Sequence, residues 1–184
     1  MKELSLNILD IAQNSITARS TLIKIELVEE GNLFTLTISD NGCGMSREMV
    51  ESVTDPFCTT RKTRKVGLGI PFLKMQAEMT GGSFSISSKS ELDYPLDHGT
   101  VTKAVFYKDH IDFTPLGDIV SSLCTLIHGA GDIDIRFTHK SEQNEVVLDT
   151  RELKEVLGEG ISLSEPEILS WIEQYLSEQY NSYK

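Results

Sequence analysis

The stretch Ser39-Asp40-Asn41-Gly42-Cys43-Gly44-Met45 decides the fold, because its Asp-x-Gly-x-Gly turn closes a strand of alternating apolar and polar residues. That strand spans residues 33–39, and its alternation buries one face while it delivers Asp40 to the edge of a core. A carboxylate there accepts a hydrogen bond from an exocyclic amine, and glycines let the backbone approach a flat base. The turn therefore indicates adenine recognition, and a plain β-turn is the alternative.

A polar stripe on an upstream helix supplies a second group of candidates. Residues 3–18 have the periodicity of an amphipathic helix, with a packed side formed by Leu4, Ile8, Ile11, Ala12 and Ser15. Asp10 and Asn14 project together from another side, which they share with Glu3 and Asn7. The amide oxygen of Asn14 suits Mg²⁺, and Asp10 is placed to orient or deprotonate a water aimed at a terminal phosphate. A solvated helix face is the alternative for both.

A run of cations precedes a pair of glycines farther along the chain. Arg61, Lys62, Arg64 and Lys65 stand just before Gly67-Leu68-Gly69 in a chain of formal net charge −11. Glycine-rich backbone leading into a predicted helix at residues 70–79 offers N–H groups and a positive helix end to an anion such as a triphosphate. A basic surface loop is the alternative. Nucleic-acid binding is not expected, because these few cations lie in an acidic protein with a pI of about 4.8.

These motifs occur in a fixed order that resembles a known superfamily. The helix with Asp10 and Asn14, the Asp-x-Gly-x-Gly turn, the sequence at residues 56–60, the glycine pair and Gly99-Thr100 are similar to the motifs of the gyrase, heat-shock chaperone, histidine kinase and mismatch-repair (GHKL) ATPases. The resemblance covers roughly residues 1–108 and is closest to histidine-kinase catalytic domains, with their N, G1, F and G2 boxes. It implies an α/β (α+β) two-layer sandwich of the Bergerat type, a mixed sheet under helices with ATP held between them beneath a lid.

The resemblance also assigns ligand-binding residues. It implies that Asn14 holds Mg²⁺, that Asp40 binds the adenine amine, and that Thr100 contacts the adenine side through water. It places Gly42 and Gly44 at the base and Gly67 and Gly69 at the phosphates. The other residues assigned to ATP binding are Met45, Thr60, Arg61, Lys62 and Leu68.

The departures from the superfamily pattern bear on the reaction. No helical hairpin with a phospho-accepting histidine is expected, since the four histidines, at positions 98, 110, 128 and 139, all follow the second glycine box. Asp10 stands where the hydrolytic members carry a glutamate and where histidine kinases tend to carry asparagine. A shorter carboxylate there suits a base for water or, as in the anti-sigma-factor kinases, for a hydroxyl. The prediction is a Mg·ATP-binding kinase or ATPase in regulation or signalling, of serine/threonine or histidine type, with a phosphoryl acceptor or protein partner. A non-catalytic nucleotide-sensing regulator is the alternative.

Length and composition bound these interpretations. The chain of 184 residues is 39% hydrophobic and 24% charged, which is typical of a globular protein. Its apolar runs are too short for a membrane span, and its first residues lack the apolar core of a signal peptide, so a cytoplasmic protein is expected. Its three cysteines are scattered, which indicates neither a disulfide framework nor a zinc site.

Residues 109–184 form a second region, predicted to be α+β and of unknown role. Helices are expected at residues 116–128, 151–157 and 165–180, and strands at 132–138 and 145–149 form a hairpin. Trp171 and Tyr175 are expected to pack against that hairpin with the other apolar residues of the last helix; a partner surface is the alternative. Alternation places Asp132 and Asp134 on a solvent-facing side.

Overall fold

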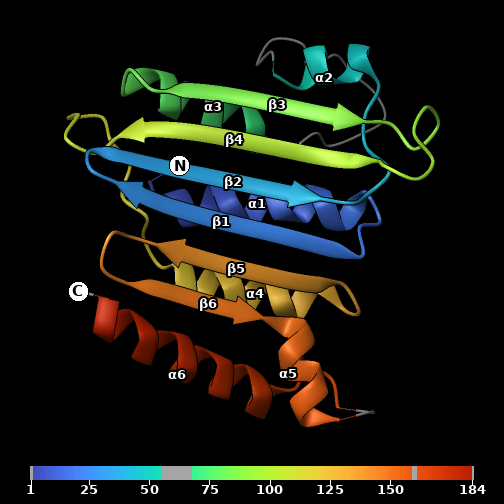
Figure 1. Cartoon of the computed structure of the whole chain (residues 1–184), viewed down its shortest axis with the longest axis vertical. Helices are drawn as coiled ribbons and strands as arrows, with labels where there is room; N and C mark the ends of the chain where they lie inside the picture. The colour runs from blue at the N-terminus through green and yellow to red at the C-terminus, as the bar shows by residue number, and fades with distance from the viewer. Residues whose placement is uncertain (1, 55–67, 159–160, 184) are drawn as a thin grey trace.

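In the computed structural model, which describes residues 2–54, 68–158 and 161–183, six strands form one sheet in the order β3-β4-β2-β1-β5-β6 (Figure 1). Neighbouring strands are antiparallel except for β1 and β5, which are parallel. The elements in chain order are α1 (Leu4–Thr17), β1 (Leu22–Glu30), β2 (Leu33–Asp40), α2 (Arg47–Val53), α3 (Gly69–Met79), β3 (Ser83–Lys89), β4 (Gly99–Tyr107), α4 (Ile119–Ala130), β5 (Asp134–Lys140), β6 (Glu145–Asp149), α5 (Thr150–Leu157) and α6 (Pro166–Tyr183). The mixed sheet and helices confirm the predicted α/β fold class.

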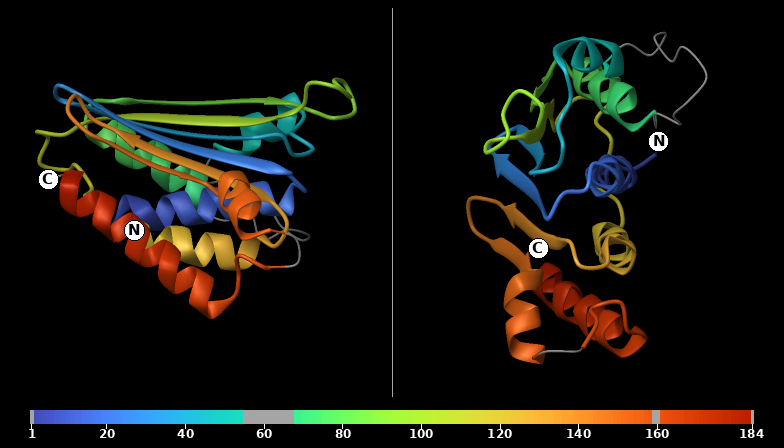
Figure 2. Two further views of the ribbon diagram at one scale, coloured as in Figure 1. Left: turned by 60° about the horizontal axis from the view of Figure 1, so that its bottom comes forward. Right: turned by 90° about the vertical axis from the view of Figure 1, so that its right-hand side faces the viewer.

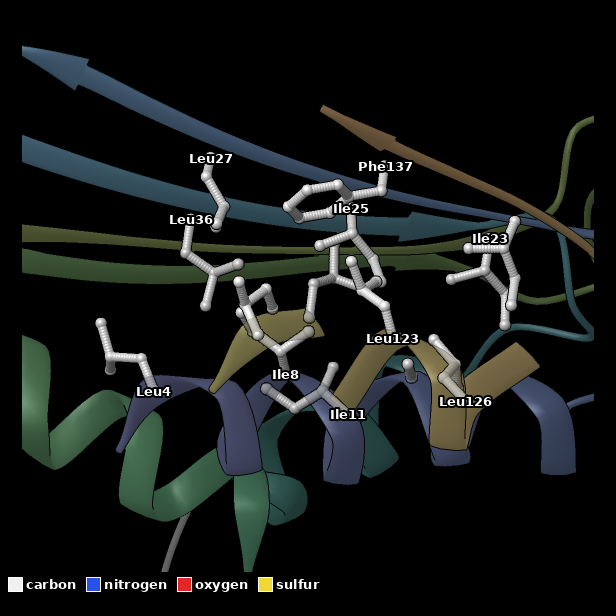
Figure 3. Packing of buried hydrophobic residues seen from close by; sticks show 14 of the residues in the cluster. Leu4, Ile8, Ile11, Ile23, Ile25, Leu27, Leu36, Leu123, Leu126 and Phe137 are labelled. Carbon is white, nitrogen blue, oxygen red and sulfur yellow. The ribbon is translucent and has the colours of Figure 1, made fainter. Parts of the chain in front are cut away.

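Helices α1, α3 and α4 cover one face of the sheet, as the end-on view in Figure 2 shows. The packing follows from the spacing of apolar residues in both layers. Every second residue of the central strands faces the helices, and every third or fourth residue of α1 faces the sheet. Figure 3 shows Leu4, Ile8 and Ile11 of α1 pointing at Ile25 and Leu36 of the sheet. All five side chains are at most 3% exposed, so this layer is the core.

The C-terminal region continues the same sheet. Strand β5 pairs with β1 from Leu22 opposite Asp134 to Val28 opposite Lys140, and α4 packs beside α1. A single cluster of buried apolar side chains contains residues from both sides of position 108, such as Ile25 and Phe137. The division into residues 1–108 and 109–184 stays a prediction about roles, while the packing joins the two segments through one core.

Helix α6 lies along the β6 edge of the sheet (Figure 1). It buries Ile172 and Leu176, each 0% exposed. Trp171 and Tyr175 are 51% and 38% exposed, so the prediction that they pack against the hairpin is wrong. The helix needs only one face for anchoring, and the two aromatic residues lie off that face.

Within the described part of the chain, no helix combines the length and the apolar character needed to cross a membrane.

Candidate functional site

Asp40 lies at the end of β2 with its side chain on the helix-covered side of the sheet. It has the same strand parity as the buried residues Leu36 and Ile38, which face the helices. Ser15 of α1 donates its hydroxyl to Asp40 Oδ2 over 2.6 Å, and the Gly42 backbone N–H donates to Asp40 Oδ1 over 2.9 Å. A carboxylate offers about four lone-pair sites, so two remain for a ligand. The carboxylate is therefore fixed in orientation and can still accept hydrogen bonds.

Thr100 is the direct cross-strand partner of Asp40 on β4 and faces the same side. Its hydroxyl lies 2.9 Å from the Ser88 hydroxyl, and Ser88 also accepts the Met45 backbone N–H over 2.8 Å. Ser88 in turn lies 2.9 Å from the carbonyl of Gly99. The structure thus brings Asp40, Thr100 and Met45 to one corner of the sheet.

The glycines of the turn are required by close packing within the protein. A Cβ on Gly42 would lie 2.8 Å from the Ala18 Cβ, at the end of α1. Gly44 has φ +64°, and a Cβ there would collide with the backbone carbonyl of Lys89. Side chains at either position would therefore push the turn away from α1 or from β3. Their contact with a base stays a prediction.

His98 was not among the predicted site residues, yet it holds the same turn. Its Nδ1 lies 2.6 Å from the carbonyl oxygen of Gly42, and the Glu91 backbone N–H donates to the Cys43 carbonyl over 2.9 Å. The segment between β3 and β4 is thus bonded to the Asp-x-Gly-x-Gly turn at two points. Ser15 and Ser88 were not predicted as site residues either. A single hydroxyl or imidazole side chain produces no periodic pattern in the sequence, so none of the three could be recognised from spacing. The only available clue was the hydroxyl of Ser15 on an otherwise apolar helix face.

Asp10 faces the first turn of α3. A Cβ placed on Gly69 would lie 2.9 Å from the Asp10 Cβ and 3.4 Å from its Oδ2, so only glycine permits this approach. Leu68, the residue before the helix, is 50% exposed. The arrangement puts a carboxylate next to a helix N-terminus, where the free backbone N–H groups favour anionic groups.

Asn14 and Asp10 are exposed one turn apart on α1. Neither side chain makes a hydrogen bond to any other residue in the ranges that the structure describes, so both keep their oxygen atoms available. Hard oxygen donors of this kind suit Mg²⁺, which takes most of its other ligands from water and phosphate. The amide oxygen of Asn14 therefore fits the predicted role of a magnesium ligand.

Four predicted residues, Thr60, Arg61, Lys62 and Gly67, lie outside the described residues. The others form two groups joined by α1: Asp40, Gly42, Gly44, Met45 and Thr100 near its C-terminal end, and Asp10, Asn14, Leu68 and Gly69 along its exposed side. A separate depression of about 560 Å³ is lined by residues such as Gly131, Lys154 and Leu163 and contains none of them.

The fold and this arrangement of residues define a class of ATPase-like domains, and comparisons with known proteins agree. Residues 1–110 match the family described as histidine kinase-, DNA gyrase B-, and HSP90-like ATPase, so the chain belongs to that family. It is similar to a sensor-like histidine kinase of Rhizobium meliloti (35% identity over 77 residues; 39% of this chain, 15% of the relative). It is also similar to the CAI-1 autoinducer sensor kinase/phosphatase CqsS of Vibrio cholerae (36% over 70 residues; 38% and 10%). The chain thus spans a small part of the curated relatives that it matches.

The fold is shared with the ATPase domain of Aquifex aeolicus MutL, solved with ADP. The TM-score is 0.51 at 15% identity, over 85% of this chain and 69% of that chain. A match over 85% of 184 residues is too long to fit within residues 1–110, so the similarity of fold extends into the C-terminal region.

Proposed function

We propose that this protein binds Mg·ATP along α1 and transfers or hydrolyses its terminal phosphoryl group in a regulatory or signalling role. The observation that supports the proposal most strongly is the hydrogen-bonded position of Asp40, whose two carboxylate oxygens are oriented by Ser15 and Gly42 and still have free lone pairs. An oriented carboxylate at the end of a sheet matches the need of an exocyclic amine for an acceptor.

Helix α1 sets the distance between the two ends of the nucleotide. Ser15, which contacts Asp40, and Asp10, which contacts Gly69, are five residues apart, and the helical rise puts them about 7.5 Å apart along the axis. This spacing allows the base at Asp40 and the phosphates at the start of α3. A domain of the same fold, that of MutL, was solved with ADP, which is consistent with nucleotide binding by this fold.

Asp10 is the proposed catalytic residue. Its exposed carboxylate lies beside the N-terminus of α3, where it is placed to take a proton from an attacking water or hydroxyl as the bond to the terminal phosphoryl group breaks. Asn14 is proposed to hold Mg²⁺, which when bound would supply positive charge to neutralise the phosphate oxygens. Thr60, Arg61, Lys62 and Gly67 complete the proposed phosphate-binding segment.

A nucleotide-sensing regulator with little turnover is the second candidate. It is favoured by the C-terminal region, whose strand β5 pairs directly with β1 and whose last helix exposes aromatic side chains. A change of conformation at the nucleotide would have a direct structural path to that region.

Two carboxylate substitutions and γ-labelled ATP separate these functions. Asp40→Asn should weaken ATP binding, measured calorimetrically with Mg²⁺, by at least about tenfold, because an amide nitrogen cannot accept from an amine. Asp10→Asn should leave binding nearly intact and lower label transfer or phosphate release by about 10²–10⁴-fold. Asp132→Asn, which changes an exposed carboxylate outside this group, is the control.

Each outcome has a distinct meaning. Loss of labelled product in Asp10→Asn with intact binding supports the enzyme, and the labelled species identifies the acceptor as protein or water. Unchanged, very low turnover in both proteins supports the sensor. Undetectable binding of the unsubstituted protein at about millimolar ATP, the weak end of the affinity scale, contradicts both candidates.

A further inference from the structure

Helix α6 carries an exposed stripe made of Glu167, Trp171, Gln174, Tyr175 and Glu178. These residues recur at intervals of three and four positions, so they share one side of the helix. The Trp171 and Tyr175 rings stack at 5.3 Å between centroids with planes 9° apart. The stripe therefore presents a preformed aromatic platform with a carboxylate on either side.

The platform is not needed to attach the helix. Ile172 and Leu176 are buried on the adjacent face, and the Gln179 side chain bonds both the N–H and the carbonyl of Val147 on β6. Two large aromatic side chains, 51% and 38% exposed, thus remain accessible on a helix that is already anchored. Stacked rings lose little conformational freedom when a partner covers them, which favours their use in binding.

The charge of the chain is strongly uneven. Residues 1–108 contain 13 acidic and 12 basic side chains, whereas residues 109–184 contain 15 acidic and 5 basic ones. Helix α6 itself carries three glutamates and no lysine or arginine. A surface with this potential attracts cationic groups and repels nucleic acids and anionic membranes.

We propose that the α6 stripe is a docking surface for a basic, arginine-containing segment of a protein partner. A guanidinium stacks flat on an indole or phenol ring and at the same time pairs with a carboxylate. Glu167 and Glu178 lie about one turn from the rings, and Gln174 donates to Glu178 over 2.9 Å, which orders that carboxylate. Charge complementarity and stacking together select arginine over lysine.

Trp171 makes the test direct, because it is the single tryptophan of the chain and its emission reports this surface alone. The probe is a labelled helical peptide of about 16 residues with about six arginines, titrated without nucleotide, and matched peptides carry lysine or glutamate instead. The arginine peptide should change Trp171 emission saturably and raise the anisotropy of the label. The lysine peptide should bind more weakly, and the glutamate peptide should not bind.

Substitutions test whether the arginine peptide binds to the α6 stripe. Tyr175→Ser and Trp171→Ser, followed by anisotropy, should each weaken arginine-peptide binding about tenfold, and Glu167→Lys with Glu178→Lys should abolish it. The control is Glu30→Lys with Glu78→Lys, which makes the same change in net charge at exposed positions in the first 108 residues and should lose far less affinity. Thermal unfolding verifies that each variant is folded.

Several results would overturn the proposal. They are the absence of peptide binding, equal loss in the control, and binding of anionic vesicles in place of the peptide. A change of Trp171 emission with protein concentration alone would assign the stripe to a second copy of the chain. Since no nucleotide is present, failure here leaves the proposed ATP chemistry untouched, and loss of ATP binding leaves this test valid.

Discussion

Asn7 of α1 is fully buried, although in the sequence it belongs to the same polar stripe of the helix as Asp10 and Asn14. It is 0% exposed, and neither its amide nitrogen nor its oxygen has a hydrogen-bond partner in the part of the chain that the structure describes. A buried amide without partners costs free energy, about 1–3 kcal/mol in proteins. The residue is therefore expected to lower stability relative to an apolar side chain of the same size.

Replacing Asn7 by leucine should raise the free energy of unfolding by about 1–2 kcal/mol. Leucine has the same branching and number of side-chain heavy atoms, buries no polar group and is a better helix former. Urea denaturation measures the effect as a higher midpoint with an unchanged slope. The exposed Asn14→Leu is the control, with an expected change within about 0.5 kcal/mol. A lower midpoint for Asn7→Leu would mean that the amide is satisfied by a buried water.

At the scale of elements, α6 closes one edge of the sheet. The Gln179 amide donates to the Val147 carbonyl over 3.1 Å and accepts the Val147 N–H over 3.0 Å, as a neighbouring strand would. Near the end of the helix, Asn144 donates to the Tyr183 carbonyl over 3.2 Å. Exposed strand edges promote pairing between molecules, so this contact protects β6.

Gln179→Ala should lower the free energy of unfolding by about 1–3 kcal/mol and increase self-association, because it leaves the N–H and carbonyl of Val147 unpaired. Thermal unfolding and analytical ultracentrifugation measure the two effects. Gln174→Ala removes a glutamine from the exposed side of the same helix and should change neither. Equal effects in both variants would mean that helix propensity, not edge protection, is the cause.

Local periodicity predicted most elements of the fold but not how they assemble. Residues 3–18 and 33–39 were predicted to form a helix and a strand because their apolar residues repeat at helical and strand intervals. The observed α1 and β2 confirm both predictions. The pairing of β5 with β1 is parallel and joins segments about 110 residues apart, so no local pattern specifies it. The prediction that Trp171 packs against the hairpin was wrong because helical spacing alone does not say which of two apolar sides of a helix is covered.

Some residues of the candidate site could likewise be predicted from local sequence, and others only from the assembled fold. Asp40, Asp10 and Asn14 were identified because residue type and spacing within one motif carry their signal. Ser88 and His98 reach the turn only in the folded chain, since their contacts with Met45 and Gly42 join residues 43 and 56 positions apart in sequence. Such contacts need the assembled sheet.

At the scale of the whole molecule, a partly buried polar network around His139 joins the two segments of the chain. His139 on β5 is 2% exposed, with Nε2 3.0 Å from Glu29 of β1 and Nδ1 2.9 Å from the Tyr180 hydroxyl of α6. Lys108 donates to Glu29 over 2.9 Å, and the Tyr183 ring packs 4.6 Å from the imidazole. Neutral His139 fits these contacts, with Nε2–H donating to Glu29 and Nδ1 accepting from Tyr180.

This network predicts a loss of stability in mild acid. Burial lowers the pKa of His139 below its ordinary 6.5 and outweighs the hydrogen bond to Glu29, which raises it. The unfolded chain therefore takes up the proton first, and stability falls as the pH drops through about 6.5 toward the lower pKa of the folded state. Burial raises the pKa of Glu29, but the hydrogen bonds of Lys108 and His139 bring it below 4.5, so its contribution is lost only in stronger acid.

Urea denaturation at a series of pH values between about 7 and 5 measures this dependence, because the slope reports the difference in bound protons between the two states. His139→Gln should flatten the slope in that range even if it lowers stability at every pH. His128→Gln, which removes an exposed histidine of α4, is the control variant. If His139→Gln kept the full slope, another group would carry the proton. The network would then hold the C-terminal segment on the sheet without making that attachment sensitive to pH.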